Sequence, residues 1–280
     1  MKKMLFCLMS FFIISVLFVA TLMVSCRKGV KMAVREEPPI AETPGRPLIP
    51  FIWDDDGSPD GVIALLYLLR HPEVNVKAIT VSCGEAHPAL FAQNLTRMLA
   101  LLEKTHIPVA AGRDVPLEGN NAFPEPWRQW SDTFWGIKLP DAGEAIQPIS
   151  AAHLIVDTVK QSPEPVTIIV SGTHTNLAEA LRLDATIVSK IRAMECMGGA
   201  INVPGNIEND WPDFHNRVAE WNIWIDPIAA NEVFSSGIPI HLTPLDATKK
   251  VVWEKTDAAA WGKGKTPEGD LARKILEWML

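Results

Sequence analysis

Beyond residue 48, short apolar runs alternate with longer stretches in which apolar residues recur at helical spacing. The short runs predict strands at residues 49–54, 76–82, 108–111, 166–171, 193–197 and 239–242. The longer stretches predict helices at residues 60–70, 88–103, 149–160, 176–183 and 227–234. Because strands and helices that alternate in this way form α/β folds, we expect an open, mostly parallel, Rossmann-like sheet with helices on both faces.

One stretch departs from this alternation. Residues 119–136 are rich in proline and aromatic residues and have no clear periodicity, which predicts a long irregular loop. Trp127, Trp130 and Trp135 would either form a lid that stacks on a flat ligand or pack on the domain as a small local core. The sequence leaves both interpretations open.

The N-terminal region differs in character from the rest of the chain. Two lysines precede an apolar stretch at residues 4–24, and small residues then lead to Cys26, a pattern typical of a bacterial lipoprotein signal whose cysteine is lipidated. The alternative is an uncleaved anchor, since the stretch is long enough to span a bilayer. Residues 27–47 are rich in proline and charge and predict an extended tether. We therefore expect an exported, membrane-tethered protein, periplasmic or on the cell surface, whose folded domain covers residues 48–280 after a signal at 1–26.

Charge and cysteine content narrow the kind of ligand. The 280-residue chain has a formal charge of −7 and no basic cluster beyond its N-terminus, which argues against nucleic-acid binding and favours a small neutral or cationic ligand. Cys83 and Cys196 follow apolar runs and are expected to be buried thiols, although the sequence leaves a single bridge open.

Candidate chemistry begins at the end of the first predicted strand, in the segment FIWDDDGSPDG. Asp54, Asp55, Asp56 and Asp60 place four carboxylates within seven residues. Such crowding raises pKa values by mutual repulsion, which a cation or a polyhydroxyl ligand would relieve, and all-oxygen sites favour Ca²⁺ or Mg²⁺. A solvated acidic loop is the alternative, but the carboxyl end of a strand is where open α/β sheets bind ligands.

Three more polar segments each follow a predicted strand: SGTHTNLA at residues 171–178, MGGA and PGN within 197–206, and AEWNIWIDP at 219–227. Singly, each segment fits turn chemistry, and His174 alone is better explained as a loop histidine with satisfied hydrogen bonds than as a catalytic residue. Together with the aspartate cluster, in this order, they resemble the nucleoside hydrolase family of the inosine–uridine preferring type, over residues 48–248.

This resemblance implies an enzyme that hydrolyses the N-glycosidic bond of ribonucleosides to base and ribose with a metal-activated water, in purine or pyrimidine salvage. The implied metal is Ca²⁺, with Mg²⁺ less favoured, held by Asp54, Asp56 and the backbone carbonyl of Thr175. Asp56 would also be the general base, and the base would leave after protonation or while stacked on the aromatic segment. The sugar would be bound by Asp60, Glu85, Asn206, Glu220 and Asn222. Because dimers and tetramers are common in the family, a homo-oligomer is expected.

The chain departs from the family pattern at three places. Gly61 replaces an aspartate that ligates the metal, and Glu85 replaces a sugar-facing asparagine. Glu85 would return the lost carboxylate or, alternatively, cap the helix that begins at Pro88. After Trp253 the likeness to the family fades. The family's last metal-binding aspartate and its leaving-group histidine have no counterpart in this sequence. The helical pattern at 271–280 is followed by no strand and would leave an apolar face uncovered. We therefore expect a fragment or a truncated homologue with weak or no hydrolysis.

These departures keep a second class of function open. A non-catalytic exported protein that binds nucleosides or related sugars would retain the same fold and pocket. Gly61 and the C-terminal segment favour this binding protein, whereas the intact acidic and amide residues of the motifs favour the enzyme.

Overall fold

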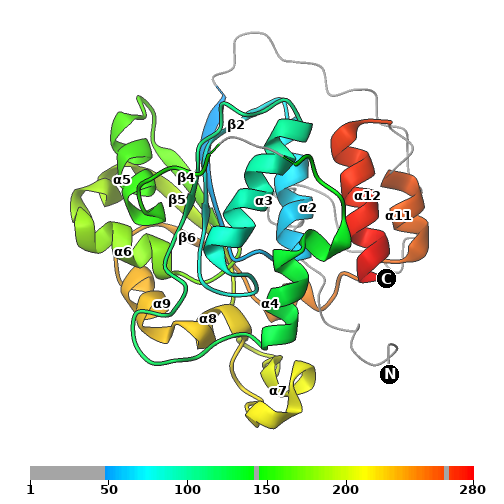
Figure 1. Cartoon of the computed structure of the whole chain (residues 1–280). Helices are drawn as coiled ribbons and strands as arrows, with labels where there is room; N and C mark the ends of the chain where they lie inside the picture. The colour runs from blue at the N-terminus through cyan, green and yellow to red at the C-terminus, as the bar shows by residue number, and fades with distance from the viewer. Residues whose placement is uncertain (1–47, 142–144, 262–264) are drawn as a thin grey trace, which may run out of the picture.

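The fold is described by a computed structural model that covers residues 48–141, 145–261 and 265–280 (Figure 1). The predicted export signal and tether at residues 1–47 lie outside the described residues. Within the described ranges, no helix is both long enough and apolar enough to cross a membrane.

Six strands form one sheet in the described part of the chain. They are β1 (Ile49–Asp55), β2 (Val74–Val81), β3 (Val109–Ala111), β4 (Val166–Val170), β5 (Ile191–Met197) and β6 (Ile240–Thr243). The longer helices are α2 (Pro59–Arg70), α3 (Pro88–Leu101), α4 (Glu125–Asp132), α5 (Ala151–Gln161), α6 (Thr175–Leu183), α9 (Pro227–Phe234), α11 (Lys255–Trp261) and α12 (Pro267–Met279). Shorter helical segments are α7 (Ile207–Asp210), α8 (Trp221–Ile225), α10 (Leu245–Thr248), η1 (Phe134–Gly136), η2 (Ala185–Lys190) and η3 (Pro212–Phe214). Each predicted strand and helix is present, with ends that differ by no more than two residues.

The strand order is β3-β2-β1-β4-β5-β6, and all neighbouring strands are parallel. This result confirms the predicted α/β class. The chain proceeds from β1 outward to β3 on one side and then from β4 outward to β6 on the other, so the order reverses between β1 and β4. At such a switch point a crevice opens at the carboxyl ends of the two strands, where open α/β sheets bind ligands. Asp54 pairs with Val170 there, directly before the Asp55-Asp56 and Ser171-Gly172 segments.

Helices cover both faces of the sheet, with α2, α3 and α12 on one side and α5, α6 and α9 on the other (Figure 1). Successive residues of β1, Ile52 and Trp53, are buried in the two different cores. This division follows from the strand itself, because neighbouring side chains of a strand point to opposite faces. A strand buried on both faces reads as a continuous apolar run, as β1 does before its aspartates.

The C-terminal helix differs from our expectation. Leu271, Ile275 and Leu276 of α12 are buried in the same core as α2, against which α12 packs. The prediction of an uncovered apolar face was therefore wrong, because α2 presents a complementary apolar surface to this helix.

The stretch at 119–136 also contains more regular structure than its sequence predicts. It forms α4 and η1, and α4 turns Trp127, Arg128 and Ser131 inward. Two prolines at the start of α4 conceal the helix in the sequence, although proline is well tolerated in a first helical turn.

Candidate functional site

A pocket lies at the carboxyl ends of the strands, where the sheet order reverses. Its lining brings together acidic, amide and aromatic side chains from segments far apart in the sequence. The lining residues are Asp56, Ser58, Asp60, Glu85, Phe123, Trp127, Ser171, Met197, Asn206, Asp210, Glu220, Trp221, Asn222, Leu245 and Thr248. Six of the predicted site residues are thus placed together, namely Asp56, Asp60, Glu85, Asn206, Glu220 and Asn222.

Asp56 lies directly after β1 and is tightly enclosed. A Cβ atom at Gly172 would lie only 2.5 Å from Asp56 Cβ, and a Cβ at Gly84 would also overlap the Asp56 side chain. Both glycines are therefore needed for this close approach. The Glu85 amide donates a hydrogen bond to Asp56 Oδ2 at 3.2 Å. Burial, followed by repulsion from Asp55, raises the pKa of Asp56 well above its usual value.

Asp60 enters the pocket from the first turn of α2. The helix begins here because Ser58 caps it, accepting a hydrogen bond from the Gly61 amide at 3.1 Å, and because Pro59 occupies the first helical position. A carboxylate in the first turn is favoured by the positive end of the helix dipole. The β1–α2 connection thus delivers Asp56, Ser58 and Asp60 to one pocket.

Glu85 follows β2 and faces the same pocket, with 7% of its surface exposed. Burial and the nearby carboxylates of Asp56 and Asp60 raise the pKa of Glu85 well above its usual value. The alternative of a helix-capping role is not supported, because the N-cap residue of α3 is His87, whose side chain makes no capping hydrogen bond.

Glu220 and Asn222 tie the carboxyl ends of β4 and β5 together. Glu220 Oε2 accepts from the Gly199 amide at 2.9 Å, and Oε1 accepts from the Asn222 amide at 3.0 Å. Asn222 Nδ2 donates to the carbonyl oxygens of Ser171 at 3.1 Å and Met197 at 3.2 Å. These bonds fix the orientation of two predicted sugar-binding side chains before any ligand arrives.

Aromatic rings form another part of the lining. Phe123 and Trp221 stack with ring centroids 4.7 Å apart, and Trp127 lies 5.6 Å from Trp221. We call Phe123, Trp127 and Trp221 the aromatic wall. Trp127 Nε1 is buried and, within the described ranges, has no hydrogen-bond partner. The wall therefore offers flat aromatic surface to a ligand.

The local-core interpretation of the tryptophan-rich stretch holds for Trp127, which packs with the rest of the aromatic wall in a small core separate from the two main ones. Trp127 lines the pocket, whereas Trp135 is buried in the main core, 5.9 Å from Phe91. Trp130 is 43% exposed and packs near Trp278. A lid made from all three tryptophans is therefore not observed.

Asp54, a predicted metal ligand, does not line the pocket. Its Oδ1 accepts hydrogen bonds from Thr80 Oγ1 and Asn176 Nδ2, both at 2.7 Å. Its Oδ2 is buried without a hydrogen-bond partner in the part of the chain that the structure describes. Burial raises the pKa of Asp54 to about 7, although the two hydrogen bonds oppose the shift.

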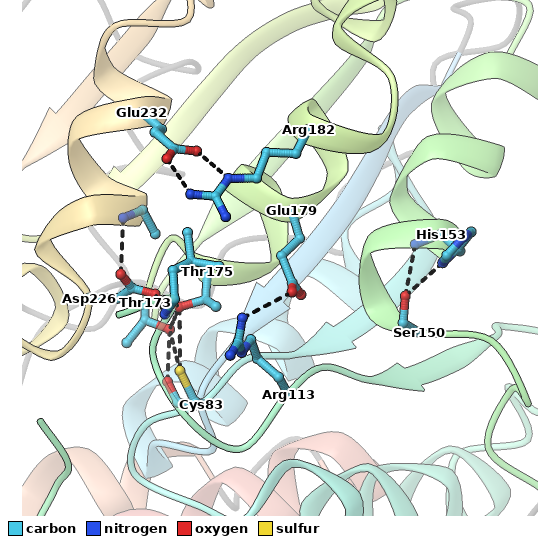
Figure 2. A network of polar contacts seen from close by, with 12 residues as sticks. Cys83, Arg113, Ser150, His153, Thr173, Thr175, Glu179, Arg182, Asp226 and Glu232 are labelled. Carbon is cyan, nitrogen blue, oxygen red and sulfur yellow. Dashed lines mark hydrogen bonds and ion pairs between the residues drawn. The ribbon is translucent and has the colours of Figure 1, made fainter. Parts of the chain in front are cut away.

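Thr175 also lies behind the pocket lining. Figure 2 shows its side chain in a network with Cys83, Thr173 and Asp226. Thr175 Oγ1 donates to Asp226 Oδ2 at 2.7 Å and lies 3.4 Å from Cys83 Sγ. Asp226 caps α9 through the Ala229 amide at 3.0 Å, so the network anchors residue 175 to that helix. This anchoring holds in place the backbone carbonyl that the resemblance assigns to the metal.

Cys83 and Cys196 are buried free thiols, as predicted. Cys196 Sγ lies 3.1 Å from His174 Nε2. Burial lowers the pKa of His174 to about 4, which keeps this histidine neutral near pH 7. His174 does not line the pocket, but it is not the satisfied loop histidine that the sequence predicts: it is fully buried directly before α6, and within the described ranges its Nδ1 has no hydrogen-bond partner.

The space beside Gly61 is filled by another side chain. A Cβ at Gly61 would overlap Asp55 Oδ2, so the Asp55 side chain occupies the space that a longer residue at position 61 would need. Asp55 is held there by Ser171 Oγ, which donates to Oδ2 at 2.6 Å, and by the Gly57 amide at 2.8 Å. Burial raises the pKa of Asp55 to about 7.

Asp210 is a pocket residue that the sequence did not predict. It ends α7, and its Oδ2 accepts a hydrogen bond from Trp221 Nε1 at 3.0 Å. Burial raises the pKa of Asp210 to about 7. No sequence signal marks this residue, because it lies between the PGN and AEWNIWIDP motifs in a segment whose folding against Trp221 is a tertiary effect.

The donor set determines which cations the pocket suits. Its lining carries Asp56, Asp60, Glu85, Asp210 and Glu220, and none of the described lining residues is Lys, Arg or His. Crowded oxygen donors without a basic partner fit a hard divalent cation. Among the described residues, however, no three His, Cys, Asp or Glu side chains are already arranged as a metal site. The donor chemistry thus fits Ca²⁺ or Mg²⁺, and binding would require the carboxylates to converge.

The fold and pocket define a class: an α/β protein whose acidic, aromatic-walled site lies at the switch point of a parallel sheet. Residues 51–280 match the family described as inosine-uridine preferring nucleoside hydrolase, and the chain belongs to that family. The protein is accordingly a nucleoside hydrolase enzyme, which supports ribonucleoside hydrolysis over the binding-only alternative.

Individual relatives support the same assignment. The chain is 36% identical over 232 residues to the pyrimidine-specific ribonucleoside hydrolase RihA of Escherichia coli O127:H6, covering 83% of this chain and 71% of that protein. It is similar to the inosine-uridine preferring nucleoside hydrolase of Bacillus anthracis, with a TM-score of 0.71, 25% identity and coverage of 83% and 77%. It also resembles the purine-preferring ribonucleoside hydrolase of Gardnerella vaginalis, with a TM-score of 0.72, 25% identity and coverage of 82% and 71%.

Proposed function

We propose that the pocket binds a ribonucleoside with its ribose on the acidic and amide side and its base against the aromatic wall. One observation carries this proposal: a single pocket combines carboxylates and amides from several strand ends with three aromatic side chains. Sugar hydroxyls are good partners for carboxylates and amides, whereas a flat base gains from contact with aromatic rings. The proposal covers both purine and pyrimidine ribonucleosides.

We further propose that Asp54, Asp56 and the Thr175 carbonyl hold Ca²⁺ in preference to Mg²⁺, with Glu85 supplying the carboxylate that Gly61 lacks. Two observations support this assignment: within the described residues Asp54 Oδ2 has no hydrogen-bond partner, and the pocket lining carries five carboxyl groups but no Lys, Arg or His. When bound, the cation would lower the pKa of a water molecule and contact ribose hydroxyls.

The remaining roles belong to the protein's own side chains. Asp56 accepts the proton of the water that attacks the anomeric carbon. Positive charge develops on the ribose ring as the glycosidic bond breaks, and Asp60 and Glu220 stabilise it. Asn206 and Asn222 hold the sugar hydroxyls in the orientation that the attack requires.

Location and assembly are proposed on the sequence alone. The basic residues, apolar stretch and cysteine within 1–26 support export and lipidation at Cys26, with an uncleaved anchor as the alternative. A homo-oligomer is proposed from the resemblance to the family. Labelling with a radioactive fatty acid, compared between the natural chain and Cys26→Ser, would test the lipoprotein assignment.

Turnover of ribonucleosides tests the proposed function directly. The full chain is incubated with uridine, cytidine, inosine and adenosine in the presence of Ca²⁺, and free base and reducing sugar are measured. Because of the departures at Gly61 and beyond Trp253, we expect slow release of both products from at least one nucleoside, and loss of this release when a chelator is added. Tight binding of a nucleoside without product release would contradict the proposal.

Thermal unfolding tests the cation independently of activity. The pKa values of Asp54 and Asp55 are raised to about 7 by burial, so the folded state binds more protons than the unfolded chain between about pH 4 and 7. Without cation, stability therefore falls as the pH rises through this range. Because Ca²⁺ binds the ionised carboxylates, we expect it to raise the melting temperature at pH 8 by about 5–10 °C at roughly 100 times its Kd, and by less at pH 5.

Two variants sharpen this measurement. Glu85→Gln is expected to weaken Ca²⁺ binding at pH 8, since it removes a carboxylate from the lining, whereas Asp213→Asn changes an exposed residue and is expected to have no effect. Unchanged Ca²⁺ affinity in Glu85→Gln would contradict the compensating role of Glu85.

A further inference from the structure

Asp210 comes from a different part of the fold than the pocket carboxylates that follow β1 and β2. Asp56, Asp60 and Glu85 follow β1 and β2, whereas Asp210 comes from α7, a short helix away from the strand ends (Figure 1). Its direct hydrogen-bond partner is Trp221 Nε1, a group of the aromatic wall. Asp210 therefore places a carboxyl group beside the surface that receives the base, on the proposed binding mode.

The hydrogen bond from Trp221 also determines how this carboxyl group can act. Because Oδ2 accepts the indole N–H, a proton on the protonated acid lies on Oδ1. Trp221 is itself fixed by stacking on Phe123, so the carboxyl group has a defined position. None of the described lining residues is a histidine or a lysine, and Asp210 is a lining carboxyl group that is hydrogen-bonded directly to the aromatic wall.

We propose that Asp210 is a catalytic residue that protonates the departing nucleobase, an inference that rests on the proposed function. As the bond between the anomeric carbon and the base nitrogen breaks, its electron pair remains on the base, and the Asp210 proton passes to a ring nitrogen or carbonyl oxygen of that base. Water adds to the anomeric carbon and gives its proton to Asp56. The products are neutral base and ribose; Asp56 then releases its proton to solvent, and Asp210 takes one up, so both carboxyl groups return to their starting states.

The environment of Asp210 keeps the acid available near neutral pH. Burial raises its pKa to about 7; the Trp221 hydrogen bond and the positive charge of Lys249 oppose this shift, and the Glu220 carboxylate supports it. Glu85 is a further carboxylate whose charge interacts with Asp210. A substantial fraction of Asp210 is therefore protonated at pH 7, which suits a general acid.

Two substrates with different leaving groups can distinguish a catalytic role of Asp210 from a structural one. Nitrophenolate leaves without being protonated. Hydrolysis of p-nitrophenyl β-D-ribofuranoside therefore needs the carboxylates and amides that bind the ribose, but it does not need a proton from Asp210. Asp210→Asn keeps an oxygen that can accept from Trp221 Nε1 but has no acidic proton. We expect this variant to lower kcat for the best nucleoside by about 100-fold or more and to change kcat for the nitrophenyl riboside less than about threefold.

The matched control is Asp213→Asn, which changes an exposed aspartate close to Asp210 in the chain and should leave both activities unchanged. Equal loss of both activities in Asp210→Asn, or retention of both, would overturn the proposal. The natural protein provides a second measurement: nucleoside turnover should decline as the pH rises past about 7, whereas nitrophenyl riboside turnover should not. Parallel pH profiles for the two substrates would also overturn it. If the natural protein cleaves neither substrate, the proposed function itself fails, which is a distinguishable result.

Discussion

Replacement of Asp56 with asparagine is expected to lower kcat for nucleoside hydrolysis by about 10²- to 10⁴-fold. Asparagine keeps the shape of the side chain between Gly84 and Gly172 but cannot accept the proton of the attacking water. It also removes a negative charge from the proposed cation site. Steady-state kinetics with the best nucleoside substrate, measured at saturating Ca²⁺, would check this expectation.

The same variant should be at least as stable as the natural protein when no cation is present. Burial and repulsion from Asp55 disfavour the ionised form of Asp56, and asparagine carries no charge. A higher melting temperature together with lost activity would show that Asp56 is retained for chemistry. Near-normal turnover in Asp56→Asn would remove the general base from the mechanism.

Gly61→Asp is expected to destabilise the protein by about 2–4 kcal/mol, despite restoring the carboxylate of the family pattern. The new side chain would overlap Asp55, which is buried and hydrogen-bonded to Ser171 and Gly57. Urea unfolding of the single variant, compared with Gly61→Ala, would separate the steric part of this cost from the electrostatic part. Even alanine should be destabilising, since its Cβ already meets Asp55 Oδ2.

The double variant Asp55→Thr with Gly61→Asp should recover most of that stability. Threonine frees the space beside residue 61 and suits a strand position, so the two changes are expected to couple by about 1–3 kcal/mol. Simple additivity of the two single effects would contradict the view that residues 55 and 61 share one carboxylate-sized space.

The strands were predictable because a strand that is buried on both faces of a parallel sheet has a continuous apolar sequence. Ile52 and Trp53 show this, each buried in a different core. The acidic and amide residues of the pocket were predictable because parallel strands bring their carboxyl ends to one edge. Local sequence therefore carries both the sheet and much of the proposed sugar site.

Other features depend on contacts that no local pattern records. Asp210 reaches the pocket because Trp221 binds its carboxylate, and the two residues are brought together only by the folded chain. Trp127 and Trp135 share one aromatic stretch but enter different environments, since α4 and the turn at η1 direct them apart. The exchange between Asp55 and Gly61 is likewise visible only once the space beside Gly61 is known.

The central position of β1 affects how the protein folds while it is synthesised on the ribosome. Phe51 pairs with Thr167, so the first strand acquires its second neighbour only after more than a hundred further residues have been made. Contacts between residues so distant along the chain form slowly, because the entropy cost of closing a large loop precedes the stabilisation that the contacts provide. A nascent chain that lacks β4 and the Glu220–Asn222 segment would carry the aspartates of β1 without the partners that enclose them. The enzyme should therefore gain its ligand affinity late and abruptly during synthesis.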